Sequence, residues 1–275
     1  MNLLILGGKG MAGHMITAYF KQKSDYNVFY TSRDKNDKDG IFLDVTDTTR
    51  LEEVINAIKP DIVINCIGIL NDNASKDINL AFQLNSLLPH QLIKLLDRIN
   101  AKLIHISTDC VFLGTKGAYT ERDIPDGTSV YAKTKQLGEI FCNPHLTIRT
   151  SIIGPELKEN GIGLFLWFMN QKGKIKGYEN VYWNGVTTLE LAKAIEKMIK
   201  KDITGLYHLG SNNKISKYQL LKLIQKTFRK NDVEIVPDTE IVLDRTIKST
   251  RTDFIYPILS YEEMLLELKD WMCQQ

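Results

Sequence analysis

Apolar and polar positions follow two different rhythms along the first 150 residues of the chain. Short apolar runs of strand length occupy residues 3–6, 28–31, 61–67, 102–106 and 146–150. Amphipathic stretches with helical spacing occupy residues 11–21, 49–58, 80–98, 129–141 and, further along, 189–200. Pro60 ends the second of these helices, and Pro89 lies inside the third, where it predicts a kink. Strands that alternate with helices predict βαβ units around a parallel sheet.

The regular alternation is lost from about Ile152 onward. We therefore predict an α/β protein with two parts. Residues 1–155 are expected to form a doubly wound parallel sheet of the Rossmann type, covered by helices on both faces, and residues 181–210 are expected to return to it. Residues 156–275 are expected to form, for the most part, a smaller α/β substrate-binding lobe over the carboxyl edge of the sheet.

Composition and charge narrow the class of protein. Of the 275 residues 43% are hydrophobic and 25% are charged, as in ordinary globular domains, and the net charge of +2 comes without a long run of one sign. We therefore expect neither a nucleic-acid nor a membrane partner. The four cysteines form no C-x-x-C pair, a strand pattern begins at Asn2, and no apolar run reaches the ~20 residues of a membrane helix. These features favour a cytoplasmic protein with free thiols and without a metal site.

A glycine-rich turn follows the first strand and leads directly into the first helix. Gly7, Gly10 and Gly13 have the G-x-x-G-x-x-G spacing, and Met11 is the first helical residue. The first glycine permits a tight turn, the second lets the backbone approach a pyrophosphate at the helix N-terminus, and the third allows the helix to pack closely on the strand. The turn therefore predicts a dinucleotide site in residues 1–155, the alternative being an ordinary strand–helix turn.

The end of the second strand bears on which dinucleotide is bound. Enzymes that use NAD usually offer an acidic residue there to the ribose 2′-hydroxyl. Here the strand ends in Ser32 and Arg33, which suit a 2′-phosphate because a guanidinium binds phosphate through two parallel hydrogen bonds. Asp34 follows and weakens the distinction, and a solvated loop position for Arg33 is the alternative. We favour NADPH over NADH, and expect Asp44 and Val45 near the adenine.

A tyrosine and a lysine one helical turn apart are the clearest sign of chemistry. Tyr131 and Lys135 lie on the same face of the expected helix 129–141. A cation near a phenol favours the phenolate and lowers the pKa of the tyrosine, which then serves as an acid or base near neutral pH. The spacing alone also fits an exposed helix pair. The glycine turn, together with Thr108 directly after the fourth strand, makes a catalytic pair the better interpretation.

These motifs resemble the extended short-chain dehydrogenase/reductases, and among them the dTDP-4-dehydrorhamnose reductase group. The matching segments are residues 7–13, 65–68, 85, 107–112, 131–139 and 149–151, with looser similarity at 183–187 and 244–245. The resemblance implies an NADPH-dependent enzyme that reduces the C4 ketone of a nucleoside-diphosphate 4-keto-6-deoxy sugar in deoxy-sugar or polysaccharide biosynthesis. It also implies a homodimer.

The resemblance further implies roles for individual residues. Thr108 would hydrogen-bond the substrate carbonyl, Tyr131 would donate its proton to that oxygen, and Lys135 would hold the nicotinamide ribose and lower the pKa of Tyr131. The expected cofactor contacts are Gly7, Gly10, Met11, Gly13, Ser32, Arg33, Asp44, Val45, Cys66, Gly68, Asn85, Tyr131 and Lys135. The expected substrate contacts are Thr108, Asp109, Trp183 and Arg245.

The chain departs from the rhamnose reductases at Cys110, where that group usually has a tyrosine. GDP-fucose synthase and related epimerase/reductases resemble the chain in having a cysteine there, and in them the thiol exchanges the proton next to the keto group. Two hypotheses stay open: Cys110 epimerises C3, with or without C5, before the reduction, or it is a small buried hydrophobe. Inversion needs a second acid/base, and since no histidine lies between His145 and His208, Lys158 is the candidate.

The aromatic and basic residues of the expected lobe allow two interpretations each. Trp167, Tyr178 and Trp183 fit either stacking on the nucleotide or the core of the lobe. Arg245 and Arg251 fit either a grip on the pyrophosphate, for which the resemblance favours Arg245, or a surface position.

The sequence also leaves alternatives open for the substrate and for the class of function. UDP, dTDP and GDP are not distinguished by the sequence, although the loop at residues 71–76 is expected to border C2 and favours an N-acetylated UDP sugar. The alternative from another class is a non-catalytic, NADP-binding regulatory subunit, because a subunit of methionine adenosyltransferase is similar to the same family. The chain keeps the catalytic set that such a protein can lose.

Overall fold

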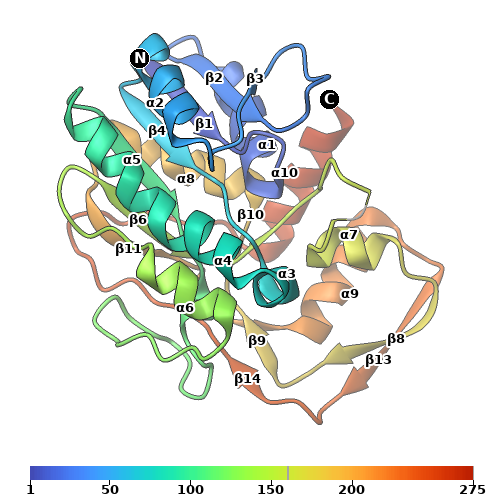
Figure 1. The fold of residues 1–275 in the computed structure, drawn as a ribbon. Coiled ribbons are helices and arrows are strands. Elements are labelled where there is room, and N and C mark those ends of the chain that lie inside the picture. The colour runs from blue at the N-terminus through green and yellow to red at the C-terminus, as the bar shows by residue number, and fades with distance from the viewer. Residues whose placement is uncertain (160, 275) are drawn as a thin grey trace.

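The centre of the molecule is a parallel sheet with the strand order β11–β6–β5–β4–β1–β2–β3 (Figure 1). The strands are β1 (Asn2–Leu6), β2 (Asn27–Ser32), β3 (Ile41–Phe42), β4 (Ile62–Asn65), β5 (Lys102–Ile106), β6 (Leu146–Thr150) and β11 (Gly205–Leu209). The structure is a computed structural model and describes residues 1–159 and 161–274. The strand order reverses between β1 and β4, which makes the loops after these strands the expected ligand-binding point of the sheet. The predicted doubly wound α/β fold is confirmed.

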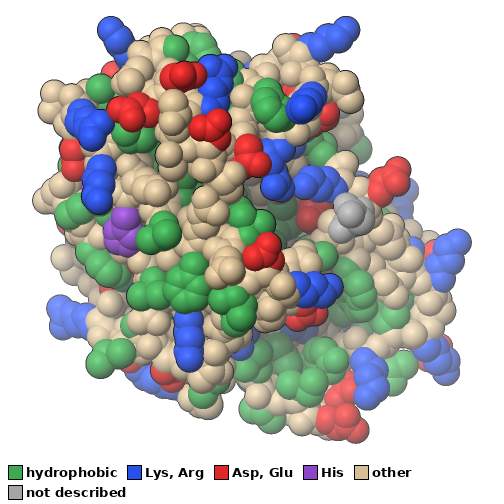
Figure 2. Space-filling model, in the orientation of Figure 1, with side chains coloured by type: hydrophobic (Ala, Val, Ile, Leu, Met, Phe, Trp, Pro, Cys, Tyr) green, Lys and Arg blue, Asp and Glu red, His purple; other side chains and the backbone are tan. Residues whose placement is uncertain are grey.

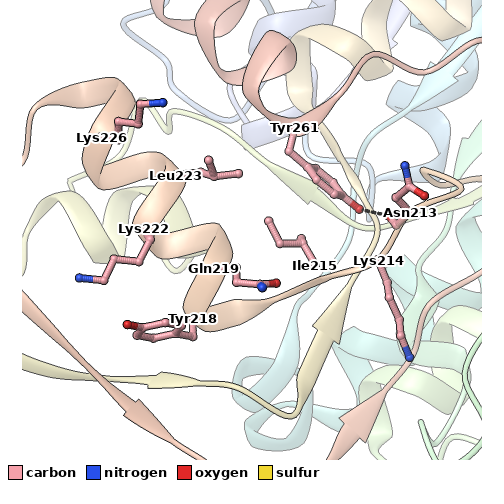
Figure 3. A pocket seen from close by; sticks show the side chains of 9 residues that line it. All are labelled: Asn213, Lys214, Ile215, Tyr218, Gln219, Lys222, Leu223, Lys226 and Tyr261. Carbon is pink, nitrogen blue, oxygen red and sulfur yellow. Dashed lines mark hydrogen bonds between the residues drawn. The ribbon is translucent and has the colours of Figure 1, made fainter.

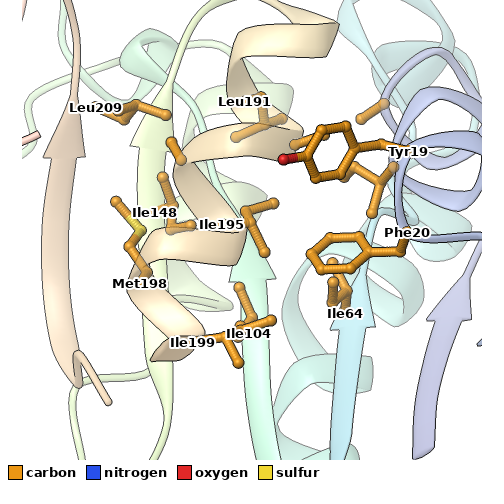
Figure 4. Packing of buried hydrophobic residues seen from close by; sticks show 14 of the residues in the cluster. Tyr19, Phe20, Ile64, Ile104, Ile148, Leu191, Ile195, Met198, Ile199 and Leu209 are labelled. Carbon is orange, nitrogen blue, oxygen red and sulfur yellow. The ribbon is translucent and has the colours of Figure 1, made fainter. Parts of the chain in front are cut away.

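Helices cover both faces of the sheet, because successive side chains of each strand point to opposite faces. The covering helices are α1 (Met11–Lys21), α2 (Thr48–Ile58), α5 (Leu88–Asp97) and α8 (Thr188–Lys200). Leu3 of β1 belongs to the core formed with α1 and α8, and the next residue, Leu4, belongs to the core formed with α2 and α5. Figure 4 shows Phe20 of α1 and Ile195 of α8 lying together over the strands of the sheet.

The segment 80–98, expected to be one helix with a kink at Pro89, is divided before the proline. α4 (Ile78–Ala81) continues into a π-helical segment (Phe82–Leu87), which then continues into α5. Pro89 lies in the first turn of α5, where a residue without an N–H group is well tolerated. The irregularity in this helix is a π-helical turn directly before Pro89, a feature often found at functional sites.

α6 (Val130–Leu137) is shorter than the helix predicted at residues 129–141. Ser129 caps its N-terminus, where the side-chain oxygen accepts a hydrogen bond from Ala132 N at 3.1 Å. The helix ends at Gly138, which lies so close to the π-helical segment that a Cβ there would be 1.9 Å from the carbonyl oxygen of Asn85. A close contact between two backbones, invisible in the hydrophobic pattern, therefore ends α6 early.

The C-terminal half adds α8 and β11 to the large sheet and otherwise forms smaller units. Its further elements are β7 (Ile152–Ile153), α7 (Leu164–Met169), β8 (Gly173–Tyr178), β9 (Val181–Trp183), β10 (Val186–Thr187), β12 (Ile215–Ser216), α9 (Lys217–Phe228), β13 (Val233–Asp238), β14 (Leu243–Asp244) and α10 (Tyr261–Cys273). β8 pairs in parallel with β13, and β9 lies between β12 and β14. A separate apolar core joins α7, α9 and α10 with β8, β9, β12 and β13. In Figure 1 they lie beside the large sheet, past the carboxyl ends of its central strands.

The molecular surface carries mixed charges. Basic and acidic side chains are interspersed over the face shown in Figure 2, in keeping with the net charge of +2. Within residues 1–159 and 161–274 no helix combines the length and the hydropathy that a bilayer crossing requires.

Candidate active site

The glycine turn lies between β1 and α1, where the strand order reverses. Gly7 has a φ of +79°, which L side chains rarely adopt, and a Cβ on Gly13 would lie 2.1 Å from the carbonyl oxygen of Gly7. α1 begins after Gly10, which has no side chain to cap the helix. The first amide groups of α1 and the positive end of its dipole therefore face an open turn that suits the pyrophosphate of a dinucleotide.

The end of β2 is flanked by two cations, one of which the sequence motif did not single out. Lys9, inside the glycine turn, pairs with Asp34 at 3.0 Å and with Asp37 at 3.3 Å. The Ser32 hydroxyl accepts a hydrogen bond from Asp34 N at 3.0 Å. The acidic residue that complicated the choice of cofactor is thus already paired with Lys9, while Arg33 is exposed at the same edge. The only sequence signal for Lys9 was a long basic side chain inside the glycine motif.

Two further residues expected near the adenine follow β3. Val45 is buried in the core beneath α2, whereas Asp44 is exposed. The Asp44 carboxylate accepts hydrogen bonds from Thr46 N at 3.0 Å and Thr46 Oγ1 at 2.8 Å. These bonds and the nearby Arg33 hold the pKa of Asp44 below its usual value, so the carboxylate is ionised at the edge of the sheet.

The loop after β4 contains Cys66 and Gly68 and is braced by Asn85. The Asn85 side chain accepts a hydrogen bond from Ile69 N at 2.9 Å and donates to Ile69 O at 2.9 Å and to Thr134 Oγ1 at 3.0 Å. Asn85 is completely buried. It therefore ties the loop after β4 to α6.

Tyr131 and Lys135 both point from α6 into the protein. Tyr131 is 8% exposed and Lys135 is 4% exposed. Burial raises the pKa of Tyr131, the neighbouring Cys110 adds to the rise, and Thr108 opposes it. Burial lowers the pKa of Lys135 to about 8, against the opposing charges of Glu139 and Cys66.

The amino group of Lys135 contacts two residues of β5. Its Nζ donates to the carbonyl oxygen of Ile106 at 2.7 Å and lies 3.3 Å from Nε2 of His105. The lysine is therefore held against β5. In this arrangement the neighbour that lowers the pKa of Tyr131 is Thr108, not Lys135.

The segment after β5 brings three candidate residues to the same place. Thr108 caps a short 3₁₀ helix (Asp109–Val111): its Oγ1 accepts a hydrogen bond from Cys110 N at 3.1 Å and donates to Asp109 Oδ1 at 3.2 Å. Burial raises the pKa of Asp109 above its usual value. Burial and the Asp109 charge raise the pKa of Cys110 to about 12. Arg245 approaches from the end of β14, with Nη1 3.7 Å from Cys110 Sγ.

Lys217 is a site residue that the sequence patterns missed. It is the first residue of α9, half-buried, with its Nζ 5.4 Å from the centre of the Trp183 ring. Its charge acts on Asp109. Burial lowers the pKa of Lys217 to about 8, opposed by Asp109 and Cys110. The available signal was a lysine in the first turn of a helix, where the dipole disfavours a cation. Lys158, the candidate from the sequence, is exposed in the loop before α7.

Trp183 and Arg251, by contrast, are engaged in structural contacts. Trp183 is 3% exposed, and its Nε1 donates to Ser151 Oγ at 2.9 Å. Of the two interpretations given for its ring, the core of the smaller units is therefore the one observed. Arg251 pairs with Asp253 and donates to the carbonyl oxygen of Leu206 at 3.3 Å.

A buried ion pair supports the site from behind. The guanidinium of Arg149 in β6 donates to both carboxylate oxygens of Glu139, at 2.7 Å and 2.6 Å. The hydroxyl of Ser107, next to Thr108, donates to the same carboxylate at 2.7 Å. The chain after α6 is thereby fastened to the carboxyl ends of β5 and β6.

A groove of about 540 Å³ opens between α9 and α10 (Figure 3). It is lined by Asn213, Lys214, Ile215, Tyr218, Gln219, Lys222, Leu223, Lys226 and Tyr261. None of these is a predicted site residue. The residues that can do chemistry lie instead at the carboxyl edge of the sheet that also holds the glycine turn. They are Thr108, Tyr131, Cys110 and Lys135.

Comparison with known proteins gives a family and two relatives of the chain. The family described as the RmlD substrate binding domain matches residues 1–250 of the chain. The chain is 26% identical over 258 residues to dTDP-4-dehydrorhamnose reductase of Escherichia coli (strain K12), covering 87% of this chain and 84% of that protein. It is 25% identical over 255 residues to methionine adenosyltransferase 2 subunit beta of Mus musculus, covering 86% of this chain and 75% of that protein.

A solved structure gives the same fold. The dTDP-4-dehydrorhamnose reductase of Bacillus anthracis, crystallised in complex with NADP, superposes with a TM-score of 0.84. The match covers 98% of this chain and 99% of that one at 21% identity. At this identity the similarity is one of fold.

Proposed function

The chain belongs to the RmlD substrate binding domain family, and from that premise we propose that it is an oxidoreductase that reduces the C4 ketone of a nucleoside-diphosphate 4-keto-6-deoxy sugar. One observation carries the proposal. Tyr131 packs in one apolar cluster with Cys110, which belongs to the short 3₁₀ helix that Thr108 caps, at the carboxyl edge of the sheet that also holds the glycine turn. Two hydroxyl donors beside a dinucleotide site suit the oxygen of a ketone.

The residues have distinct roles in the proposed reaction. Thr108 and Tyr131 hydrogen-bond the C4 oxygen of the substrate, and Tyr131 transfers its phenolic proton to that oxygen. Reduced nicotinamide, when bound, supplies the hydride that C4 receives. The remaining phenolate needs a cation nearby, and Lys135, one turn along α6, is the residue for that task.

NADPH is the proposed cofactor. Lys9 pairs with Asp34, and Arg33 is exposed beside them, so the end of β2 offers cations rather than a free carboxylate to the adenosine ribose. The NADP complex of the Bacillus anthracis reductase supports the same choice.

The nucleotide and the C2 substituent follow from weaker signals. We retain UDP or dTDP as the nucleotide, with a 2-acetamido sugar as the preferred variant. The loop expected to border C2 is the short helix α3 (Asn71–Lys76), whose exposed polar side chains suit an amide.

The direct test measures loss of NADPH absorbance with a panel of UDP- and dTDP-linked 4-keto-6-deoxy sugars, with and without a 2-acetamido group. Product stereochemistry is read by NMR. We expect turnover with one of them, and the Tyr131→Phe variant should bind NADPH normally while kcat falls about 10²–10⁴-fold, the usual contribution of a general acid. Tight NADPH binding without turnover on any sugar would overturn the proposal in favour of a non-catalytic, NADP-binding subunit, and the Mus musculus relative is named as a subunit of methionine adenosyltransferase 2.

Epimerisation before reduction is a second candidate activity. It is favoured by the 3.7 Å contact between Arg245 Nη1 and Cys110 Sγ, since a guanidinium stabilises the thiolate needed to remove the proton next to the ketone. It is opposed by burial, which raises the pKa of Cys110 to about 12. Lys217 takes the place of Lys158 as the second acid/base, because its charge acts on the Asp109–Cys110 pair.

Deuterium exchange separates the two activities. The protein is incubated with the keto sugar in deuterated water without NADPH, and incorporation at C3 and C5 is followed by NMR. If Cys110 is the base, Cys110→Ser should stop the exchange while leaving ketone reduction measurable. Exchange in Cys110→Ser at the parent rate excludes an epimerase role for the thiol.

A further inference from the structure

The side-chain amide of Asn65, at the end of β4, has a defined orientation. Its Oδ1 accepts a hydrogen bond from the backbone N–H of Ile67 at 3.0 Å. The other amide atom, Nδ2, must therefore be the one that lies 3.2 Å from Nδ1 of His105. Asn65 and His105 are neighbours on β4 and β5, and both are completely buried. No rotation of the amide satisfies Ile67 and reverses the contact with His105 at the same time.

This orientation determines where His105 carries its proton. An amide NH₂ group only donates, so Nδ1 of His105 must be the acceptor. Burial lowers the pKa of His105 well below its ordinary value. The imidazole is therefore neutral, and a neutral imidazole with an acceptor Nδ1 has its proton on Nε2.

The Nε2–H group of His105 then faces Nζ of Lys135 at 3.3 Å. Two N–H donors cannot bond each other, so this contact is a hydrogen bond only when Lys135 is an amine with a free lone pair. The same Nζ still donates one hydrogen to Ile106 O at 2.7 Å. Each hydrogen-bond donor among Asn65, His105 and Lys135 therefore faces an acceptor when the lysine is neutral. With an ammonium ion, two donors would face each other.

We propose that His105 is a positioning residue for Lys135: held by Asn65 as the Nε2–H tautomer, it donates to the Lys135 amine and stabilises the neutral, retracted lysine of the cofactor-free protein. The proposed function needs a cationic Lys135 beside Tyr131. Above pH 8, assembly of the working site therefore requires Lys135 to take up a proton and to leave its contact with His105. This last step rests on the proposed function, whereas the tautomer does not.

The charged and titratable groups around Lys135 define the pH range. Tyr131 lies on α6, Glu139 follows this helix, Cys66 follows β4, and His105 lies on β5. The Glu139 carboxylate is engaged by Arg149, and Cys66 has its pKa raised to about 12 by burial. Lys135, with a pKa of about 8, is therefore the group among them that changes charge just above neutral pH, and the amine predominates above pH 8.

The first test reads the tautomer directly in cofactor-free protein labelled with ¹⁵N-histidine, by NMR at about one pH unit above the Lys135 pKa. The His105 signals are identified by their loss in His105→Gln, or by their response to Asn65→Asp if the glutamine variant does not fold. We expect an unprotonated Nδ1 and a protonated Nε2 in the parent protein. In Asn65→Asp a carboxylate oxygen replaces the NH₂ donor, and we expect the proton to move to Nδ1. An Nδ1–H tautomer or an imidazolium in the parent overturns the proposal.

The second test measures Lys135 through the pH dependence of kcat/KM. A glutamine at 105 can turn its carbonyl oxygen toward an ammonium, so His105→Gln should move the alkaline limb upward by about one pH unit. His145→Gln is the matched control: His145 is equally buried but bonds Leu103 N at 3.0 Å and Asp97 at 3.1 Å, and its loss should leave the limb in place. An unmoved limb in His105→Gln, or equal shifts in both variants, overturns the proposal. If no sugar is turned over but the tautomer is Nε2–H, the proposed function fails and the role of His105 stands.

Discussion

Replacing Glu139 with glutamine tests how much the site depends on its buried ion pair. The side chains of Glu139 and Arg149 are 0% and 2% exposed. In Glu139→Gln one carboxylate oxygen keeps its place as an amide oxygen, but an NH₂ group replaces the oxygen that Arg149 Nη2 contacts at 2.6 Å. Two donors then face each other, and the buried guanidinium has no counter-charge. Removing one partner of a buried pair costs about 3–5 kcal/mol, and we expect a loss in this range.

Urea unfolding followed by circular dichroism measures the change as a lower midpoint with an unchanged m value. Glu52→Gln is the matched control, because Glu52 pairs with Arg98 at 2.9 Å with side chains 47% and 67% exposed. A surface pair of this kind contributes about 0–1 kcal/mol. The double variant Glu139→Leu/Arg149→Met removes both charges, and should be less destabilised than Glu139→Gln alone.

The same substitution should slow the reaction. Ser107 donates to Glu139 at 2.7 Å and directly precedes Thr108, so loss of the carboxylate loosens the segment that holds the Thr108 hydroxyl. We expect a lower kcat with NADPH affinity largely kept, since the glycine turn is not part of this network. A loss of stability below about 1 kcal/mol, equal to the surface control, would refute the reasoning that the pair is sealed from water.

Three other predictions each concern a single residue. Gly138→Ala places a Cβ 1.9 Å from Asn85 O, and thermal unfolding should show a loss of about 1–3 kcal/mol or more. Arg33→Ala should weaken NADPH binding about 10–100-fold and leave NADH binding unchanged in fluorescence titrations, because charge-assisted hydrogen bonds contribute about 1.5–3 kcal/mol. The pKa of Lys135 is about 8 in the folded protein against an ordinary 10.5, so the folded state binds fewer protons between these values. The free energy of unfolding should therefore gain from this group as pH rises from 8 to 10.5, and Lys135→Met should remove that slope.

Features set by local sequence were predictable. Tyr131 and Lys135 share a helix face because 3.6 residues make a turn, and Gly7 to Gly13 form a strand–helix turn whose steric demands only glycine meets. Helix α1 was predicted to the residue, since the glycine turn marks its start and the loss of apolar spacing its end. The division into residues 1–155 and 156–275 stays a prediction.

Features set by contacts between distant segments were not predictable. The π-helical segment before Pro89 and the early end of α6 depend on each other, because Gly138 lies against Asn85 O. The orientation of Lys135 toward β5 depends on His105, a residue that the sequence pattern identified only as part of a strand. A hydrophobic pattern records which face of an element is buried, but not which backbone lies against it.

The charged groups around Cys110 come from segments far apart in the sequence, so the substrate side of the site could not be predicted without the fold. Lys217 begins α9 and Arg245 follows β14, more than a hundred residues beyond Asp109, yet the positive charges of both act on the Asp109 carboxylate. Two cations thus face one carboxylate and a thiol that burial keeps protonated. The excess positive charge suits an anionic substrate, and it also favours negative charge that develops on an oxygen next to Cys110. Removing Lys217 should therefore weaken both substrate binding and any C3 exchange, whereas removing Cys110 should affect the exchange alone.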